Sequence, residues 1–484
     1  MGPDGGGEAR EPEGEGRLLS GWGRTAPTFA RVHEPRNLAE VRRLMETAGP
    51  RGLIARGLGR SYGDAAQNAG GRVVLLSGLH GLEAVAQVDP GAGRVTVGAG
   101  TSLDALLRAV VPRGWFVLVT PGTRHVTVGG AIASDVHGKN HHVDGGFADH
   151  VVAMDLLTPA RGLRAVTPAG DGEAFRATAG GMGLTGVIVR ATIELLAVQT
   201  SRVRVDTERA ADLDELMACM EEGDHRYRYS VAWIDCLARG RHLGRGVLTR
   251  GDHATLEELP PRARHDPLRF APRPAAEVPA VVPFGLLRPA TARAFNVAWF
   301  RKAPRMERGR LQPLSAFFHP LDAVGSWHRL YGPRGFVQYQ LVVPFGKERA
   351  VRAALELLAV AGCPSFLGVL KRFGPGRGML SFPVPGWTLA LDIPASASGL
   401  GPTLDRLDRL VAEAGGRVYL AKDARLRPEL LEAMYPELDR WREVRERLDP
   451  RHVLRSDLDR RLGLSRGTRR GTADRPRVRE VAAP

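Results

Sequence analysis

The sequence has few cysteines, no long apolar run and no recognisable export signal. Its three cysteines, Cys219, Cys236 and Cys363, lie far apart among 484 residues. They show neither metal-ligand nor redox spacing, so a disulfide framework is not expected. A transmembrane helix needs about 18 consecutive apolar residues or more, and no uncharged run is that long; one of the two longest, residues 378–391, contains two prolines. The N-terminus lacks the basic and apolar regions of a signal peptide, so none is predicted.

Acidic residues are in deficit, with 53 Asp and Glu against 68 Lys and Arg, which gives a net charge of +15. Two explanations stay open: a genome that favours arginine, or attraction to anionic lipid headgroups or phosphates. No basic–aromatic repeat, zinc finger or RNP-like motif accompanies the charge, so a nucleic-acid partner is not expected. Hydrophobic residues make up 43% and charged residues 25% of the chain, which is typical of a soluble globular protein.

The length predicts two or three domains. Helical and strand-like patterns alternate up to residue 198, and longer spacers with aromatic-rich strands follow. Residues 260–289 are rich in proline and predict a long, mobile surface loop. The local patterns predict helices over 37–48 and 103–110, and strands over 52–55, 73–76, 94–97 and 336–343. The predicted divisions are a disordered tail (1–16), a cofactor domain (17–198), a substrate domain (199–425), a segment that returns to the cofactor domain (426–463) and a disordered basic tail (464–484).

A first glycine-rich turn follows a predicted strand, with Gly57, Gly59 and Gly63 in the segment 55–64. Glycines at this spacing let the backbone adopt positive φ and point successive N–H groups inward, a geometry that suits a pyrophosphate. The spacing differs from the dinucleotide fingerprint, and no apolar helix follows. Alone, the motif fits an ordinary tight turn equally well.

Two further glycine-rich segments lie at 121–140 and 179–189. In the second segment, Gly129 and Gly130 precede small residues, which permits either close approach to a flat or phosphorylated ligand or a helix packed tightly through Gly and Ala. The third segment runs directly into a β-branched strand. Three such turns within 190 residues together indicate one extended cofactor that lies across a sheet edge.

These three turns resemble the vanillyl-alcohol-oxidase or para-cresol-methylhydroxylase (PCMH) type of FAD-binding fold. The resemblance implies an α+β, two-domain architecture with a mixed-sheet substrate (cap) domain. Many members attach FAD through a His or Cys in the first turn, but this chain has Arg60, Ser61 and Tyr62 there, so non-covalent FAD is expected. The residues that the resemblance assigns to the cofactor are Arg56, Gly57, Leu58, Gly59, Arg60, Ser61, Tyr62, Pro121, Gly122, Thr123, Thr127, Gly129, Gly130, Ser134, His137, Gly138, Asn140, Gly183, Gly186, Val187, Ile188 and Lys422.

A closer resemblance, over about residues 20–463, is to the decaprenylphosphoryl-β-D-ribose 2′-oxidases. It implies oxidation of the 2′-hydroxyl of a polyprenyl-phosphoryl ribose to a keto sugar, the first half of epimerisation to the arabinose donor of cell-wall arabinan. It also implies an NAD(P)H-dependent short-chain reductase as partner and peripheral contact with the cytoplasmic membrane or another location in the cell envelope. The segments that carry it are 21–27, 55–64, 121–123, 137–142, 154–158, 318–322, 331–333, 338–340, 381–383 and 421–423.

Flavin-dependent alcohol oxidation needs a proton acceptor near the hydroxyl and cationic donors near the reduced ring. The resemblance places His137 and Lys422 there as catalytic residues. Two roles stay open for Lys422: it accepts the hydroxyl proton, or it acts only as a cation. His137 forms a pattern with His141 and His142, but no acidic or cysteine ligand has suitable spacing, so no metal is expected. The expected substrate-binding residues are Tyr62, Lys139, Phe318, Gln338, Gln340, Lys371, Thr388 and Ala390.

Three positions depart from the family pattern. Ala390 stands where the mycobacterial enzymes carry a cysteine, Thr388 where an asparagine is frequent, and Phe318 where a tyrosine is usual. Two other functions stay open. One is a soluble sugar, alditol or aldonolactone oxidase of the same superfamily, and the other is a basic polyanion-binding protein without flavin.

Overall fold

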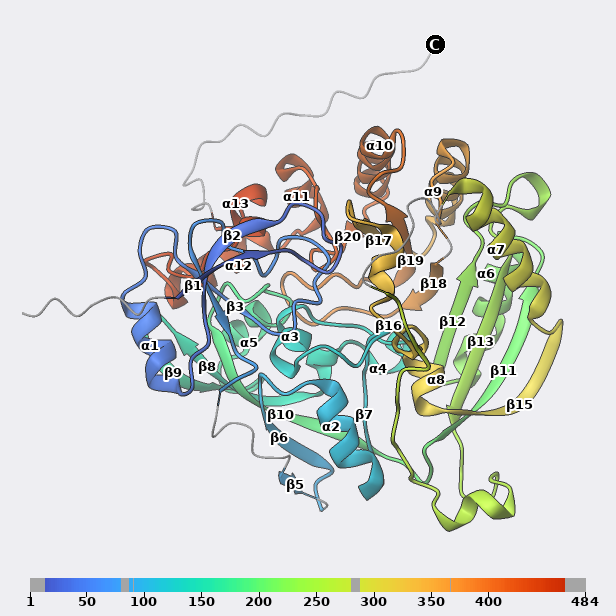
Figure 1. Cartoon of the computed structure of the whole chain (residues 1–484), viewed down its shortest axis with the longest axis horizontal. Coiled ribbons are helices and arrows are strands. Elements are labelled where there is room, and N and C mark those ends of the chain that lie inside the picture. The colour runs from blue at the N-terminus through green and yellow to red at the C-terminus, as the bar shows by residue number, and fades with distance from the viewer. Residues whose placement is uncertain (1–13, 80–86, 90, 280–287, 366, 466–484) are drawn as a thin grey trace, which may run out of the picture.

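The computed structural model describes residues 14–79, 87–89, 91–279, 288–365 and 367–465 (Figure 1). Two sheets and their helices form the N-terminal region, and one large sheet dominates the remainder. Within the described residues, no helix is both long and apolar enough to cross a bilayer.

The first sheet is mixed: its first two strands are antiparallel and the other pairs are parallel. Its order is β1 (Glu15–Leu19), β2 (Thr28–His33), β4 (Arg72–Leu75) and β3 (Leu53–Arg56). The second sheet is antiparallel. Its order is β5 (Gln87–Asp89), β6 (Arg94–Gly98), β10 (Val187–Ala197), β8 (Val151–Thr158) and β9 (Gly162–Val166), and β7 (Trp115–Val117) also pairs with β10.

Local signals explain the helices of this region. The Asn37 side chain caps the first helix by accepting a hydrogen bond from the Glu40 N–H, and Ser102 caps the second by accepting from Ala105 N–H. Each buries one apolar face. The helices are α1 (Leu38–Glu46), α2 (Leu103–Val110), α3 (Val128–Ala133), α4 (His141–Asp144) and α5 (Gly172–Thr178).

The large sheet has eight strands and is antiparallel throughout. Its order is β15 (Met306–Pro313), β11 (Arg202–Ala210), β13 (Gly246–His253), β12 (Tyr229–Ile234), β18 (Gly368–Phe373), β19 (Gly386–Pro394), β17 (Phe336–Pro344) and β20 (Arg417–Val418). Strands β14 (Ala276–Glu277) and β16 (Val324–Gly325) form a separate, parallel pair. Three helices pack on this sheet: α6 (Leu213–Gly223), α9 (Glu348–Ala361) and α10 (Leu400–Glu413). Two others, α7 (Pro289–Lys302) and α8 (Leu314–Phe318), flank β15 in sequence.

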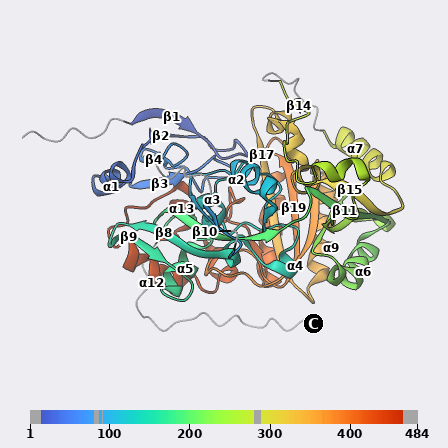
Figure 2. The same cartoon turned by 90° about the horizontal axis from the view of Figure 1, so that it is seen from below.

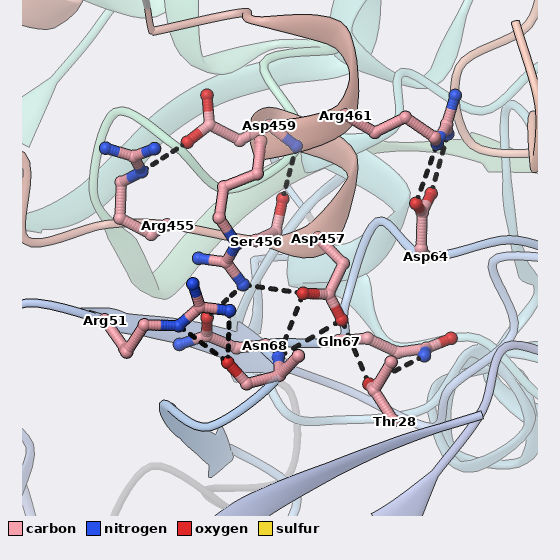
Figure 3. A network of polar contacts seen from close by, with 12 residues as sticks. Thr28, Arg51, Asp64, Gln67, Asn68, Arg455, Ser456, Asp457, Asp459 and Arg461 are labelled. Carbon is pink, nitrogen blue, oxygen red and sulfur yellow. Dashed lines mark hydrogen bonds and ion pairs between the residues drawn. The ribbon is translucent and has the colours of Figure 1, made fainter. Parts of the chain in front are cut away.

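The C-terminal helices return to the N-terminal region: α11 (Pro428–Met434), α12 (Leu438–Leu448) and α13 (Asp457–Leu462). Leu53 of β3 donates its N–H to the Val453 carbonyl at 2.8 Å. Figure 3 shows the polar contacts beside this junction, in which the Asp457 carboxylate accepts from the Thr28 hydroxyl at 3.0 Å. Residues far apart in sequence are therefore joined by buried or half-buried hydrogen bonds.

The α+β fold and the principal local elements agree with the sequence predictions, with two corrections at the tails. Glu15 and Gly16 belong to β1, because they pair with Val32 and Arg31 of β2. The C-terminal tail starts later than residue 464, since Leu464 is buried and donates its N–H to Asp459 at 3.2 Å. Within the predicted loop 260–289, the structure contains a short 3₁₀ turn at Pro261–His265 and strand β14, and residues 280–287 lie outside the described part.

Candidate active site

One face of the large sheet carries a row of polar side chains. Gln340 lies opposite Ala390, Gln338 opposite Asp392, and Lys371 opposite Thr388. Directly opposed residues of antiparallel strands point to the same side, as do residues two apart on one strand. These six residues therefore share a face, and the alternate residues of β17 and β19 face the helices as apolar core.

His137 joins this face from the N-terminal region. The side-chain amide of Gln340 lies 3.0 Å from His137 Nε2 and donates to the Thr388 hydroxyl at 2.9 Å. The Thr388 hydroxyl in turn donates to the Leu341 carbonyl at 2.8 Å. Because the Gln340 amide group is a donor, His137 Nε2 accepts and the ring proton lies on Nδ1. This contact binds the two regions together at the polar face.

The His137 ring is held as a neutral donor. Burial, with help from the charges of Lys371 and Lys422, holds its pKa well below the usual histidine value. The ring packs against Phe373 and Tyr419 with centroids 4.8 and 5.1 Å apart. Nδ1 is buried and has no hydrogen-bond partner in the described chain. A buried N–H without an acceptor is costly. A ligand with an oxygen atom beside Nδ1 would supply the missing acceptor.

Lys422 and Asp392 influence each other electrostatically at the same face. Burial lowers the Lys422 pKa to about 8, and the Asp392 charge opposes that shift. Burial raises the Asp392 pKa to about 7, and the Gln338 amide and Lys422 oppose it. Gln338 donates to Asp392 Oδ1, whereas Oδ2 has no hydrogen-bond partner within the described residues. Two groups of opposite type therefore titrate near neutral pH beside one another.

Two further buried lysines lie near the polar face. Lys371 donates to the Gly138 carbonyl at 3.2 Å, and Lys139 donates to the Phe317 carbonyl with its ammonium 4.1 Å from that ring centroid. Burial lowers the Lys139 pKa to about 7; for Lys371, burial and then the two neighbouring lysines hold the pKa well below its usual range. Neither lysine forms an ion pair in the described chain. An anionic ligand would supply the missing negative charge.

The first glycine turn offers backbone donors toward a cofactor. The N–H groups of Gly57 to Ser61 are used by no hydrogen bond within the described residues. The turn lies so close to the start of α3 that a Cβ on Gly57 would collide with the Thr127 side chain. Helix α3 is itself closely packed, since a Cβ on Gly129 would lie 2.9 Å from the Ala99 Cβ. Successive unused N–H groups on a glycine-rich backbone are the donors that a pyrophosphate needs, so the residues present fit FAD.

Backbone contacts fix this turn to Lys422. Tyr62 donates its N–H to the Ala421 carbonyl at 2.9 Å, and the Lys422 ammonium lies 5.6 Å from the Tyr62 ring centroid. A Cβ on Gly63 would collide with the Asp423 carbonyl. Arg461 of α13 pairs with Asp64 at 2.8 Å, as seen in Figure 3, and with Asp423 at 2.9 Å. The C-terminal helix therefore clamps the turn and the Lys422 loop together.

Several residues expected at the cofactor serve structural contacts instead of pointing a side chain to a ligand. The Arg56 guanidinium donates to the Ala66 and Ser20 carbonyls. Thr123 donates to Asp322 at 2.7 Å, and the Asn140 amide donates to the Leu118 carbonyl at 2.8 Å. The Ser134 carbonyl accepts from the Tyr419 hydroxyl. In Arg56, Thr123 and Asn140 the side chain is engaged in these contacts, and in Ser134 the backbone carbonyl is engaged.

The remaining expected residues fall into three places. Arg60 lies over the Trp22 ring at 3.8 Å, with a buried Nε that has no hydrogen-bond partner in the described chain, and Leu58 is exposed. The third turn packs on α3, because the Met182 N–H donates to Ala133 at 2.9 Å, and a Cβ on Gly186 would collide with Leu156. Gly183, Val187 and Ile188 belong to the same third segment. Pro121, Gly122 and Gly138 lie in the second segment, where the Gly138 carbonyl accepts from Lys371.

Phe318 does not reach the Gln340–His137 contact. Its buried ring packs against Tyr229 at 4.8 Å, Phe116 at 4.9 Å and His253 at 6.0 Å. The expectation that it lines the substrate pocket is not supported by this placement. The adjacent Lys139–Phe317 contact is the part of this segment that lies near the polar face.

Sequence reasoning missed Asp392, Arg461 and Tyr419. Asp392 could have been found as the one acid in an otherwise apolar strand, on the same alternation as Thr388 and Ala390. Arg461 gave no signal, because its partners lie at residues 64 and 423 and become neighbours only in the fold.

Comparison with known proteins identifies the family of the chain. An FAD binding domain family matches residues 29–167, and a D-arabinono-1,4-lactone oxidase family matches residues 402–462. The decaprenylphosphoryl-beta-D-ribose oxidase of Mycolicibacterium smegmatis is 45% identical over 93% of this chain and 98% of its own. An uncharacterized protein of Streptomyces coelicolor is 47% identical over 75% of this chain and 100% of its own. The L-gulono-1,4-lactone dehydrogenase of Mycobacterium tuberculosis is 22% identical over 89% of this chain and 95% of its own.

The first of these relatives shares nearly half of its residues with this chain along almost its whole length, and the matched FAD domain includes the first two glycine segments. The chain therefore belongs to the decaprenylphosphoryl-β-D-ribose oxidase family of FAD-dependent oxidoreductases.

Proposed function

We propose that this protein oxidises the 2′-hydroxyl of a polyprenyl-phosphoryl-β-D-ribose to the 2′-keto sugar with non-covalent FAD. The single observation that carries the proposal is the polar face of the large sheet, where the Lys422–Asp392 pair and the His137–Gln340 contact lie together. The activity named for the Mycolicibacterium smegmatis relative supplies the substrate class.

The chain's own residues would divide the work as follows. FAD, when bound, supplies the acceptor for the hydride that leaves C2′. The Lys422–Asp392 pair accepts the hydroxyl proton, because one of its members is deprotonated near neutral pH. His137 Nδ1–H donates a hydrogen bond to an oxygen of the ligand and keeps the ring neutral. Oxygen thereby loses its proton to the protein while carbon loses its hydride.

The substrate's negative charge would be held by Lys139 and Lys371. Both ammonium groups lie near the polar face without a carboxylate partner in the described chain, and their lowered pKa values mean that an anion would restore full protonation. This proposal favours a phosphoryl sugar over a neutral one. Tyr62, Gln338, Thr388 and Ala390 complete the proposed wall.

The biological setting follows from the same substrate. We infer that the keto sugar passes to an NAD(P)H-dependent short-chain reductase, which completes epimerisation to the arabinose donor for cell-wall arabinan. A lipid-linked substrate calls for peripheral contact with the membrane, at its cytoplasmic face or in the cell envelope.

Anaerobic reduction of the flavin tests the proposal. The purified protein is mixed with synthetic polyprenyl-phosphoribose, and loss of the visible flavin band is followed against free ribose and alditols. We expect bleaching with the phosphoribose and none with the free sugars. Bleaching by a free sugar or aldonolactone, with none by the phosphoribose, would contradict it.

A second candidate is a soluble aldonolactone or sugar oxidase. The observation that favours it is the match of residues 402–462, which include Lys422, to the D-arabinono-1,4-lactone oxidase family. The unpaired lysines argue against a neutral lactone as the natural substrate, and the experiment above distinguishes the two. A colourless purified protein would leave the third function, polyanion binding without flavin.

A further inference from the structure

One side of the molecule carries exposed apolar side chains on two separate elements. In Figure 2, the β1–β2 hairpin and α7 both lie along the upper side, together with β14, whereas α6 and α9 lie on the lower side. Leu18 and Phe29 are directly opposed in the hairpin, so both point to one face, and they are 68% and 60% exposed. This pair is an exposed apolar spot on the hairpin that a lipid surface or a partner can cover.

Helix α7 presents a second apolar pair outward. Its buried side is fixed by Ala292 and by Asn296, whose amide donates to Asp235 at 2.8 Å. Phe295 and Trp299 lie one turn apart on the outer side, stacked with centroids 5.9 Å apart, and each is 45% exposed. Trp at the boundary between apolar and aqueous phases uses its ring and its N–H at once.

The sequence segment that forms α7 carries only positive charge. Residues 288–306 contain no Asp or Glu. They contain five basic side chains that are exposed and form no ion pair within the described chain: Arg288, Arg293, Arg301, Lys302 and Arg305. A helix with aromatic residues outward and Arg or Lys around them has the composition of an interfacial anchor for anionic lipid. A protein partner would have to match the same charge with acidic residues.

The same side leads toward the proposed active site. Strand β16, which pairs with β14, runs into the segment that carries Trp327 and Tyr331. The Tyr331 ring stacks on Phe336 at 4.2 Å, and Phe336 contacts Tyr62, the neighbour of Lys422, at 5.5 Å. An unbroken set of aromatic contacts therefore runs from this side to the catalytic lysine.

We propose that the side formed by the β1–β2 hairpin and α7 rests on an anionic lipid bilayer, with Phe29 and Trp299 inserted among the headgroups. The identification of the partner as a lipid surface rests on the proposed function, because a polyprenyl-linked substrate is presented by a bilayer. Two elements at opposite ends of one side would orient the molecule, so that the aromatic segment after β16 faces the lipid.

Sedimentation with vesicles tests this surface. The full-length flavoprotein is mixed with vesicles of equal parts phosphatidylglycerol and phosphatidylcholine, and with vesicles of phosphatidylcholine alone. The double variant Phe29→Ser/Trp299→Ser should partition about tenfold less into the anionic vesicles, because two apolar side chains no longer enter the interface. Binding of the wild type should also fall with added salt and with phosphatidylcholine alone.

The matched control is Val360→Ser, which removes a 79% exposed apolar side chain of α9, a helix that lies on the lower side in Figure 2. It should bind vesicles like the wild type. All variants should keep the flavin band and the anaerobic reduction by a short-chain phosphoribose that needs no bilayer, which separates this proposal from the proposed function. Equal vesicle binding by the double variant and the wild type overturns the proposal, as does binding of the wild type to a purified acidic partner protein but not to vesicles.

Discussion

The first glycine turn and the polar face of the large sheet meet at Lys422 but are built in opposite ways. The turn works through backbone: its glycines leave no room for a Cβ, and its N–H groups from Gly57 to Ser61 stay unused. The sheet face works through side chains, which share a direction only because the strand register aligns them. We therefore expect that an added methyl group in the turn prevents flavin binding. Loss of a charge on the polar face should instead lower the reaction rate without unfolding the protein.

The largest effect should come from adding a methyl group to the turn. Gly63→Ala places a Cβ against the Asp423 carbonyl, a backbone atom that cannot rotate away. We expect loss of bound flavin and destabilisation of about 2 kcal/mol or more. Flavin absorbance and thermal unfolding would measure both.

Gly49→Ala is the matched control, because nothing lies within 4 Å of a Cβ at that position and Gly49 lies outside the three glycine-rich segments. It should keep its flavin and unfold like the wild type. Loss of flavin in both variants would show that the loss does not come from the collision at Gly63. The steric explanation for Gly63 would then be wrong.

Removing the charge of Lys422 should silence the face and leave the turn intact. Lys422→Met keeps much of the side-chain volume, so the flavin should stay bound while the anaerobic reduction rate falls about 10²- to 10⁴-fold. Stopped-flow absorbance measures the rate on protein with a normal flavin content. A variant that reduces its flavin at the wild-type rate would remove Lys422 from the chemistry.

The pH profile separates the two roles of Lys422. If Lys422 accepts the proton, the reduction rate rises with pH around its pKa of about 8. In Asp392→Asn the carboxylate no longer supports the ammonium form, so the midpoint should move to lower pH. A rate that falls with rising pH in the wild type would assign Lys422 the role of a cation only.

Phe318→Tyr tests whether this residue belongs to the core or to the substrate site. Its ring is enclosed by Phe116, Tyr229 and His253. A new hydroxyl without a ready partner there should lower stability by about 1–2 kcal/mol and leave KM unchanged. A changed KM with unchanged stability would return Phe318 to the pocket.

The smallest effect should come from Ala390→Cys. The side chain lies at the polar face opposite Gln340, and the change adds one sulfur atom without removing a contact, so activity should stay within about twofold. Thiol-trapping inhibitors should label β19 in the variant and not in the wild type, as read by mass spectrometry of intact protein. An adduct on β19 of the wild-type chain would contradict this.

The sequence predicted the parts of the fold that depend on local patterns. Alternation on β17 placed Gln338 and Gln340 on one side, and glycine spacing marked all three turns. It did not predict which polar residues would become partners, because the Gln340–His137 contact joins positions 203 residues apart. Asp392 and Arg461 owe their environment to the packing of distant strands and of α13, so their neighbours could be known only from the structure.

For the second segment the two alternatives were a helix packed tightly through Gly and Ala, and close approach of the backbone to a ligand. In the structure these two alternatives do not exclude one another. Residues Val128–Ala133 form α3, packed through Gly129 against Ala99, and the same helix lies against the first turn through Thr127. Composition alone could not distinguish close packing that serves stability from close packing that shapes a cofactor site, since both demand small residues.

We propose that the residues of the polar face assist loss of hydride from C2′ of a lipid-linked ribose. The most direct measurement is anaerobic flavin reduction by polyprenyl-phosphoribose with deuterium at C2′. The account predicts that bleaching slows several-fold with deuterium at C2′ and not with deuterium at C3′. Equal rates for all three substrates in a step limited by chemistry, or no bleaching at all, would contradict it.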